Sequence, residues 1–180
     1  VQAAERMSKI IRGLLEFSRP SDGKREELDG NDLIEGVLIF SQRIVTAKNI
    51  SLKKNYAKDL PSITGDKNQL EQVIINIINN SLDAMEHKGK LKISTRLLKL
   101  KDIQFVEMEF EDNGCGISKE NLKRMFEPFF TTKRPNKGVG LGLSVSRSII
   151  KQHKGDILVE SPVTGKDKGT IFRVRIPASR

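Results

Sequence analysis

Apolar residues recur along the chain at two different spacings, and these spacings predict alternating helices and strands. Residues 66–85 carry an apolar side chain at every third or fourth position, which is typical of a helix with one buried face. The apolar positions are Leu70, Val73, Ile74, Ile77, Ile78, Leu82 and Met85. In residues 90–100 and 106–110, apolar and polar residues instead alternate, which indicates strands with one face in water.

The same patterns predict the rest of an α/β fold. We expect strands at 26–29, 51–56, 157–160 and 170–176, and helices at 32–47, at 118–125 after a Ser118 cap, and from about Gly140 onward. The fold class is therefore a two-layer α/β sandwich, in which three helices cover one face of a mixed, largely antiparallel sheet of about five strands.

The N-terminal residues predict a long helix of a different kind. Ala3, Met7, Ile10, Leu14 and Phe17 alternate spacings of four and three, as in a coiled-coil seam, and Pro20 ends the pattern. A lone helix of this length is marginal in water, so it needs a partner helix. We expect residues 1–20 to be an incomplete helical unit and residues 21–180 to be one domain.

Composition narrows the function classes. The net charge of +9 keeps a nucleic-acid-binding module open as an interpretation, but the basic residues are scattered along the chain. One Tyr and no Trp leave few aromatic side chains on which bases could stack. No apolar run reaches the roughly 20 residues of a membrane span. A single cysteine, Cys115, forms no internal disulfide, which fits a reducing cytoplasm, and between two glycines it is interpreted as a small filler. The absence of an initiator Met and of a signal peptide leads us to expect a fragment.

Two polar features indicate a site for a nucleotide and a metal ion. Asn76, Asn79, Asn80 and Asp83 share the polar face of the 66–85 helix, where oxygen ligands suit a hydrated Mg²⁺. An exposed polar stripe is the alternative. Asp112 ends a predicted strand and opens a glycine-rich stretch with glycines at 114, 116, 138, 140 and 142. A glycine-rich turn that enters a helix presents free N–H groups to an anion.

Together these segments resemble the catalytic, ATP-binding domain of bacterial sensor histidine kinases. Residues 76–85 resemble the asparagine box of that family, 112–117 its first glycine box, 126–133 its phenylalanine box and 138–143 its second glycine box. Residues 6–20 resemble the second helix of its dimerisation hairpin. The asparagine box ends in Asn-Ser-Leu-Asp-Ala-Met, whereas the commoner form of the box ends in Lys-Tyr or Lys-Phe.

The resemblance implies a protein-histidine kinase whose cofactors are ATP and Mg²⁺. Asp112 would accept a hydrogen bond from the adenine amino group, Asn80 would hold the metal, and Lys133 would contact phosphate in a mobile lid at 128–139. The full set of implied catalytic and nucleotide-binding residues is Asn76, Asn80, Asp83, Asp112, Gly114, Gly116, Thr131, Thr132, Lys133, Gly138, Val139, Gly140, Leu141, Gly142, Leu143 and Thr170.

The resemblance also implies partners. The phosphate would pass to a histidine on the dimerisation hairpin and then to an aspartate of a response-regulator receiver domain, within a homodimeric parent that reaches a membrane only through upstream regions. His87 and His153 lack the context of an acceptor, and both are interpreted as residues at helix C-termini, where a cation is favourable at 153. An ATPase clamp of the same superfamily remains the alternative. There a glutamate activates water one helical turn before the metal-binding asparagine, and this chain has Asn76.

Overall fold

The computed structural model describes residues 24–86, 88–133 and 138–179. A five-stranded sheet in the order β2-β4-β5-β7-β6 forms one layer, and β2 (Ser51–Asn55) pairs parallel with β4 (Lys90–Leu100). The other pairs, which involve β5 (Ile103–Asp112), β6 (Asp156–Glu160) and β7 (Thr170–Pro177), are antiparallel. The predicted mixed sheet is confirmed. The predicted N-terminal helix, the unit 1–20, His87 and the centre of the lid lie outside the described residues.

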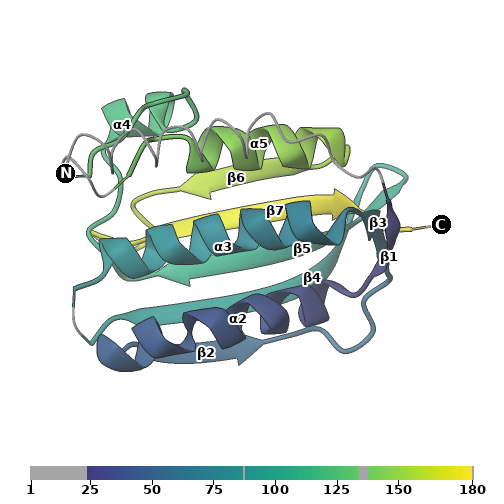
Figure 1. The fold of residues 1–180 in the computed structure, drawn as a ribbon, viewed down its shortest axis with the longest axis horizontal. Coiled ribbons are helices and arrows are strands. Elements are labelled where there is room, and N and C mark those ends of the chain that lie inside the picture. Colours follow the sequence, from purple (N-terminus) through teal and green to yellow (C-terminus); the bar gives the residue numbers. More distant parts are fainter. Residues whose placement is uncertain (1–23, 87, 134–137, 180) are drawn as a thin grey trace, which may run out of the picture.

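Three helices cover one face of this sheet. They are α2 (Gly30–Ala47), α3 (Lys67–Ala84) and α5 (Gly142–Gln152), and α3 lies between the other two (Figure 1). A short helix, α4 (Lys119–Arg124), follows the turn after β5. The apolar stripe predicted for α3 is buried against the alternating apolar positions of β4, β5 and β7, which form a single core. This layered core fixes the ends of α3 and β5 beside each other.

Local capping explains where the helices begin. Asp66 accepts a hydrogen bond from the Gln69 N–H at the start of α3, and Ser118 accepts one from the Asn121 N–H at the start of α4, as predicted. The predicted strand at 26–29 is shorter, β1 (Glu26–Leu28), because Asp29 caps α2 and moves the start of that helix to Gly30. β1 pairs with β3 (Ile63–Gly65), a strand that the sequence patterns did not predict.

His153 lies at the C-terminus of α5, as predicted, and makes a further contact that the sequence did not predict. Its side chain is buried, its Nε2 accepts a hydrogen bond from the Asp66 N–H at 3.0 Å, and its Nδ1 lies 2.8 Å from the Ile149 carbonyl oxygen. His153 therefore caps the C-terminus of α5, and its side chain also joins the end of α5 to the start of α3.

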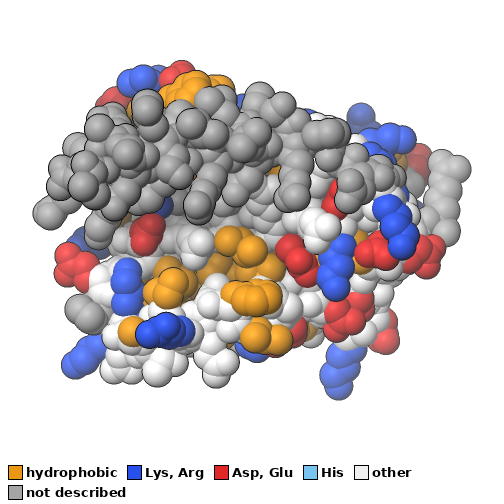
Figure 2. All heavy atoms as spheres, in the orientation of Figure 1, with side chains coloured by type: hydrophobic (Ala, Val, Ile, Leu, Met, Phe, Trp, Pro, Cys, Tyr) orange, Lys and Arg blue, Asp and Glu red, His pale blue; other side chains and the backbone are white. Residues whose placement is uncertain are grey.

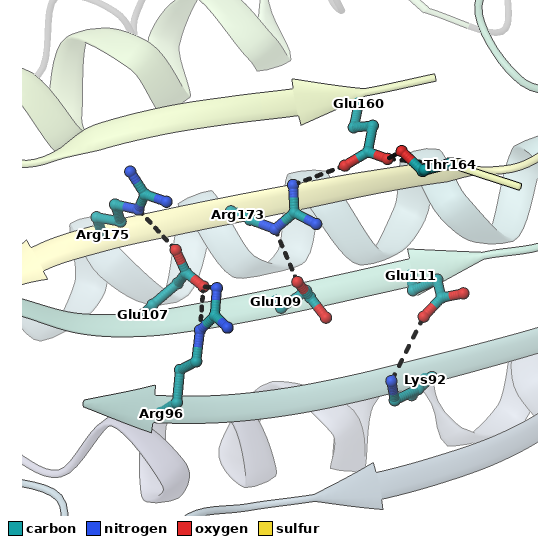
Figure 3. Close-up of polar contacts among 9 residues, drawn as sticks. All are labelled: Lys92, Arg96, Glu107, Glu109, Glu111, Glu160, Thr164, Arg173 and Arg175. Carbon is teal, nitrogen blue, oxygen red and sulfur yellow. Dashed lines mark hydrogen bonds and ion pairs between the residues drawn. The ribbon is translucent and has the colours of Figure 1, made fainter. Parts of the chain in front are cut away.

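The open face of the sheet carries rows of paired charges. Glu107 lies between Arg96 and Arg175, Glu109 contacts Arg173, and Arg173 also reaches Glu160 (Figure 3). Glu111 pairs in the same way with Lys92 and Lys166. These glutamates alternate with the core residues of β5, so the sheet twist and register bring them opposite basic residues of β4 and β7. Much of the positive charge on this face is thus neutralised within the fold.

The opposite, helical face carries exposed apolar side chains. Figure 2 shows hydrophobic side chains grouped near the middle of the surface that α2 and α3 form. Ile39 and Phe40 of α2 are the most exposed large apolar residues among those described, at 70% and 79%. No helix in the described part of the chain is both long and apolar enough to cross a membrane.

Candidate nucleotide site

A cavity of about 260 Å³ lies between the C-terminal half of α3, the turn after β5 and the start of β7. This volume is close to the lower end, about 300 Å³, of pockets that hold drug-sized ligands. Nine of the predicted site residues line it: Asn80, Asp83, Asp112, Gly116, Thr131, Thr132, Lys133, Leu143 and Thr170. Segments that are far apart in the sequence therefore meet at one place, as the motifs predicted.

A buried carboxylate lies in the wall of this cavity. The Asp112 residue is only 2% exposed and stands directly opposite Thr170 in the pairing of β5 with β7. The Gly114 N–H donates a hydrogen bond of 2.9 Å to Asp112 Oδ1. Burial raises the pKa of the Asp112 carboxyl, and the hydrogen bond from Gly114 offsets only part of that effect. A carboxylate in this position has acceptor capacity for a ligand that donates hydrogen bonds.

The turn after β5 packs tightly on the end of α3. A side chain at Gly114 would place a Cβ atom 2.7 Å from the Ala84 carbonyl oxygen, so only glycine fits without displacing the helix end. The Cys115 N–H donates to the same oxygen at 3.1 Å. This packing turns the Cys115 side chain outward to the cavity, where it is exposed. The interpretation of Cys115 as a small filler is therefore wrong.

Polar groups on α3 meet the beginning of the predicted lid. Lys133 Nζ donates to Asn80 Oδ1 at 2.9 Å and lies 2.7 Å from Asp83 Oδ2. Asn80 and Asp83 are three residues apart on one helix, so they lie on the same face. An amide oxygen and a carboxylate thus hold a cation at this end of the cavity. Within the described residues no cluster of three or more acidic, histidine or cysteine side chains forms a metal site.

The phenylalanine box and the second glycine box approach each other closely at Phe129 and Gly140. A Cβ atom on Gly140 would lie 2.5 Å from the Phe129 carbonyl carbon, which is too close for a side chain. Gly140 also has φ +77°, a backbone conformation that favours glycine. Phe126 and Phe130 pack under the guanidinium groups of Arg147 and Arg124, at 5.1 and 4.6 Å from the ring centres. Of these two rings, Phe130 also lines the cavity, so the phenylalanine box contributes to the cavity wall.

Seven predicted residues lie outside the cavity lining: Asn76, Gly114, Gly138, Val139, Gly140, Leu141 and Gly142. Asn76 Nδ2 donates to the Gly142 carbonyl oxygen at 3.1 Å and to Ser146 Oγ at 3.2 Å, so it ties α3 to α5. The helix predicted from about Gly140 begins at Gly142, and its N-terminus has no side-chain cap. Its first N–H groups therefore remain available to an anion.

The cavity also has walls that the motifs did not predict. They are Ala84, Cys115, Ile117, Asn121, Met125, Phe130 and Phe172. Most of these side chains are apolar, and they offer an apolar surface to a flat, ring-shaped ligand. Ala84, Cys115, Ile117 and Phe130 lie inside the predicted boxes but were not assigned to the site, because apolar spacing alone does not distinguish a pocket wall from the core.

A family model described as "Histidine kinase-, DNA gyrase B-, and HSP90-like ATPase" matches residues 65–180. The chain is 38% identical over 187 residues to the sensor kinase CckA of Brucella abortus, and this match covers 98% of the chain. It is 38% identical over 155 residues to the signal transduction histidine-protein kinase AtoS of Escherichia coli, which covers 86% of the chain. The aligned regions span only 19% and 25% of these two relatives.

Solved structures show the same fold. The catalytic domain of histidine kinase ThkA is 29% identical, with a TM-score of 0.74, and the match covers 87% of this chain and 99% of that one. ThkA in complex with the response regulator protein TrrA matches 98% of this chain and 48% of that one, with 27% identity and a TM-score of 0.78. The described cavity and the four boxes therefore lie on an architecture that recurs in sensor kinases.

Proposed function

The chain belongs to the family of histidine kinase-, DNA gyrase B- and HSP90-like ATPases, and from this membership we propose that it is the ATP-binding catalytic part of a sensor histidine kinase. It would transfer the γ-phosphate of ATP to a histidine on a dimerisation hairpin, for relay to an aspartate of a response regulator. The observation that carries this proposal is the cavity itself, in which a buried carboxylate, Asp112, and a cation-holding amide, Asn80, line the same space.

Asp112 is proposed to recognise adenine. Its carboxylate accepts hydrogen bonds and donates none, which suits the exocyclic amino group of adenine and disfavours a carbonyl at that position. Thr170 lies beside it, and the apolar walls would cover the faces of the base. The burial that raises the pKa of Asp112 in the nucleotide-free protein is offset when a ligand donates a hydrogen bond to the carboxylate.

Asn80 fits a hydrated Mg²⁺, because its amide oxygen already accepts a hydrogen bond from an ammonium group. When bound with ATP, Mg²⁺ would neutralise charge on the phosphate oxygens. Lys133 would bind phosphate directly as a second, mobile cation. The uncapped N-terminus of α5 would supply backbone N–H groups to the same phosphates. These residues bind and orient the triphosphate, while the phosphate acceptor comes from another segment.

The arrangement favours a kinase over an ATPase clamp. Asp83 and Asp112 are the two carboxylates among the described residues that line the cavity. Asp83 is paired with Lys133, and Asp112 is assigned here to adenine, so neither carboxylate is left with the task of activating water. Asn76, at the position of the ATPase glutamate, is an amide with its Nδ2 bound to α5. A neutral histidine nucleophile needs no such base, because its imidazole has a free lone pair.

The paired charges on the sheet argue against a nucleic-acid partner at this face. Arg96, Arg173 and Arg175 are each held by a glutamate, so this face offers few free cations to a phosphate backbone. We therefore assign no nucleic-acid partner. The proposed parent protein is a homodimer, acts in the cytoplasm, and meets its response regulator through the hairpin.

Calorimetry with Asp112→Ala tests the nucleotide site. Loss of a hydrogen bond to a charged group costs about 1.5–3 kcal/mol, so ATP affinity should fall at least about tenfold. Glu111→Gln is the matched control, because Glu111 is the neighbouring carboxylate on the opposite face of the sheet. An unchanged affinity in Asp112→Ala would remove the adenine assignment.

Radiolabelled ATP separates the kinase from the ATPase. We expect the chain alone to bind ATP and to release phosphate negligibly. A separate dimerisation hairpin that carries the acceptor histidine should become labelled, although weakly, because the effective concentration of a tethered hairpin is lost. Rapid phosphate release by the chain alone, abolished by Asn80→Ala, would move the assignment to the ATPase clamp.

A further inference from the structure

We propose that Asp83 is a positioning residue for Lys133, which holds the lysine ammonium at the phosphate end of the cavity when the metal ion takes Asn80. This inference rests on the proposed function. Its basis is the double contact of one ammonium group, to Asn80 Oδ1 at 2.9 Å and to Asp83 Oδ2 at 2.7 Å.

The first step concerns Asn80. Its single amide oxygen is the proposed ligand of Mg²⁺, and in the structure it accepts a hydrogen bond from Lys133 Nζ. A metal ion and an ammonium group on the same oxygen would repel each other strongly at this short distance. If Asn80 holds the metal, Lys133 would have to leave this oxygen.

The second step concerns Asp83. Its carboxylate lies one helical turn beyond Asn80 and binds Lys133 through a separate atom, so the metal does not displace that contact. An ammonium group has three donors, and one contact to Asp83 leaves two for phosphate oxygens. Asp83 thus keeps the cation at the cavity while Asn80 changes its occupant.

The third step asks whether Asp83 and Lys133 merely fill space in the hydrophobic core. The side chain of Asp83 is 54% exposed and that of Lys133 is 33% exposed, so neither fills the core. The contact is therefore a partly exposed ion pair at the wall of the cavity.

A double-mutant cycle on ATP affinity tests the inference. Asp83→Asn should weaken ATP binding roughly two- to fivefold, which matches an ion pair of this exposure. In a Lys133→Met background the same change should leave affinity unchanged or raise it, because the carboxylate then only repels phosphate. Asp83→Glu should restore binding. Asp156→Asn, which breaks the exposed pair with Lys151 outside the cavity, is the matched control and should change nothing.

A second readout is independent of ATP. Pulse acetylation followed by mass spectrometry should show that Lys133 reacts severalfold faster in Asp83→Asn than in the wild type, without nucleotide. Equal acetylation in both, or an Asp83→Asn that changes ATP affinity alike in both backgrounds, would overturn the positioning role. Failure of the wild-type chain to bind ATP at all would instead refute the proposed function, so the two results are distinguishable.

Discussion

Replacing Glu107 by Gln is expected to destabilise the sheet more than any other single change on its open face. The Glu107 side chain is fully buried, with Oε2 2.6 Å from Arg175 Nε and Oε1 2.7 Å from Arg96 Nε (Figure 3). Glutamine keeps the shape but removes the charge and turns an NH₂ group toward an arginine donor. Two buried glutamate contacts are thereby weakened at once.

The structure sets the size of the effect. Each hydrogen bond to a charged group contributes about 1.5–3 kcal/mol, but Arg96 is 59% exposed, so its share must be reduced for solvent screening. We therefore expect the free energy of unfolding to fall by about 2–4 kcal/mol, which is more than one such contact contributes and less than two. For a chain of this length that corresponds to a fall in Tm of roughly 5–15 °C.

The pH dependence provides a second check. Burial raises the pKa of Glu107, but the hydrogen bonds from Arg175 and Arg96 outweigh burial and hold the pKa below its usual range. A lowered pKa contributes stability above the unfolded value of about 4.3, and this contribution is lost as the pH falls through the folded value. The difference in stability between wild type and Glu107→Gln should be complete at pH 7 and shrink below about pH 4.3.

Thermal and urea unfolding followed by circular dichroism measure the difference. Glu109→Gln is the control. It should lose less stability than Glu107→Gln, because Arg173 keeps its second partner, Glu160. A Tm for Glu107→Gln equal to that of the wild type at pH 7 would refute the reasoning, and so would a loss equal to that of the control.

Three further predictions concern the cavity. Saturating Mg·ATP should slow alkylation of Cys115, which is exposed in the cavity wall, and an unchanged rate measured by mass spectrometry would place the nucleotide elsewhere. Asp112→Asn should raise stability at pH 7, because burial penalises the ionised form, and the gain should vanish below the ordinary pKa of about 3.9 when unfolding is followed against pH. Gly140→Ala should cost at least about 1–2 kcal/mol in urea unfolding from its positive φ alone, and more from contact with Phe129, whereas the exposed Gly165→Ala should cost only the φ term.

The regular elements were predictable because one period dominates each of them. The stripe of α3 and the alternation of β4 are long enough to fix type and orientation, and they agree with the structure. β3 was missed because it has three residues, Ile63–Gly65, in which no period is visible. The contact of His153 with the start of α3 was missed because its partner, the Asp66 N–H, is 87 residues away and depends on the docking of α5 on α3.

The site was predictable where a side chain acts and less so where the backbone acts. The resemblance assigned a role to the side chains of Asn80, Asp112 and Lys133, and the structure places all three in the lining of the cavity. Glycines of the second box lie beside the cavity, and their spacing does not show which N–H groups face it. The exposure of Cys115 depends on how closely Gly114 approaches Ala84, which no local pattern encodes.

The contact between Gly140 and the carbonyl group of Phe129 has a consequence for how such chains diversify. Phe129 and Gly140 approach each other closely, so the chain between them leaves and returns at the same place whatever its length. Each doubling of a flexible loop costs only about 0.6 kcal/mol in closure entropy. Insertions after Lys133 and before Gly138 should therefore cost little in folding, whereas changes at Thr131, Thr132 or Lys133 would alter the cavity that these residues line.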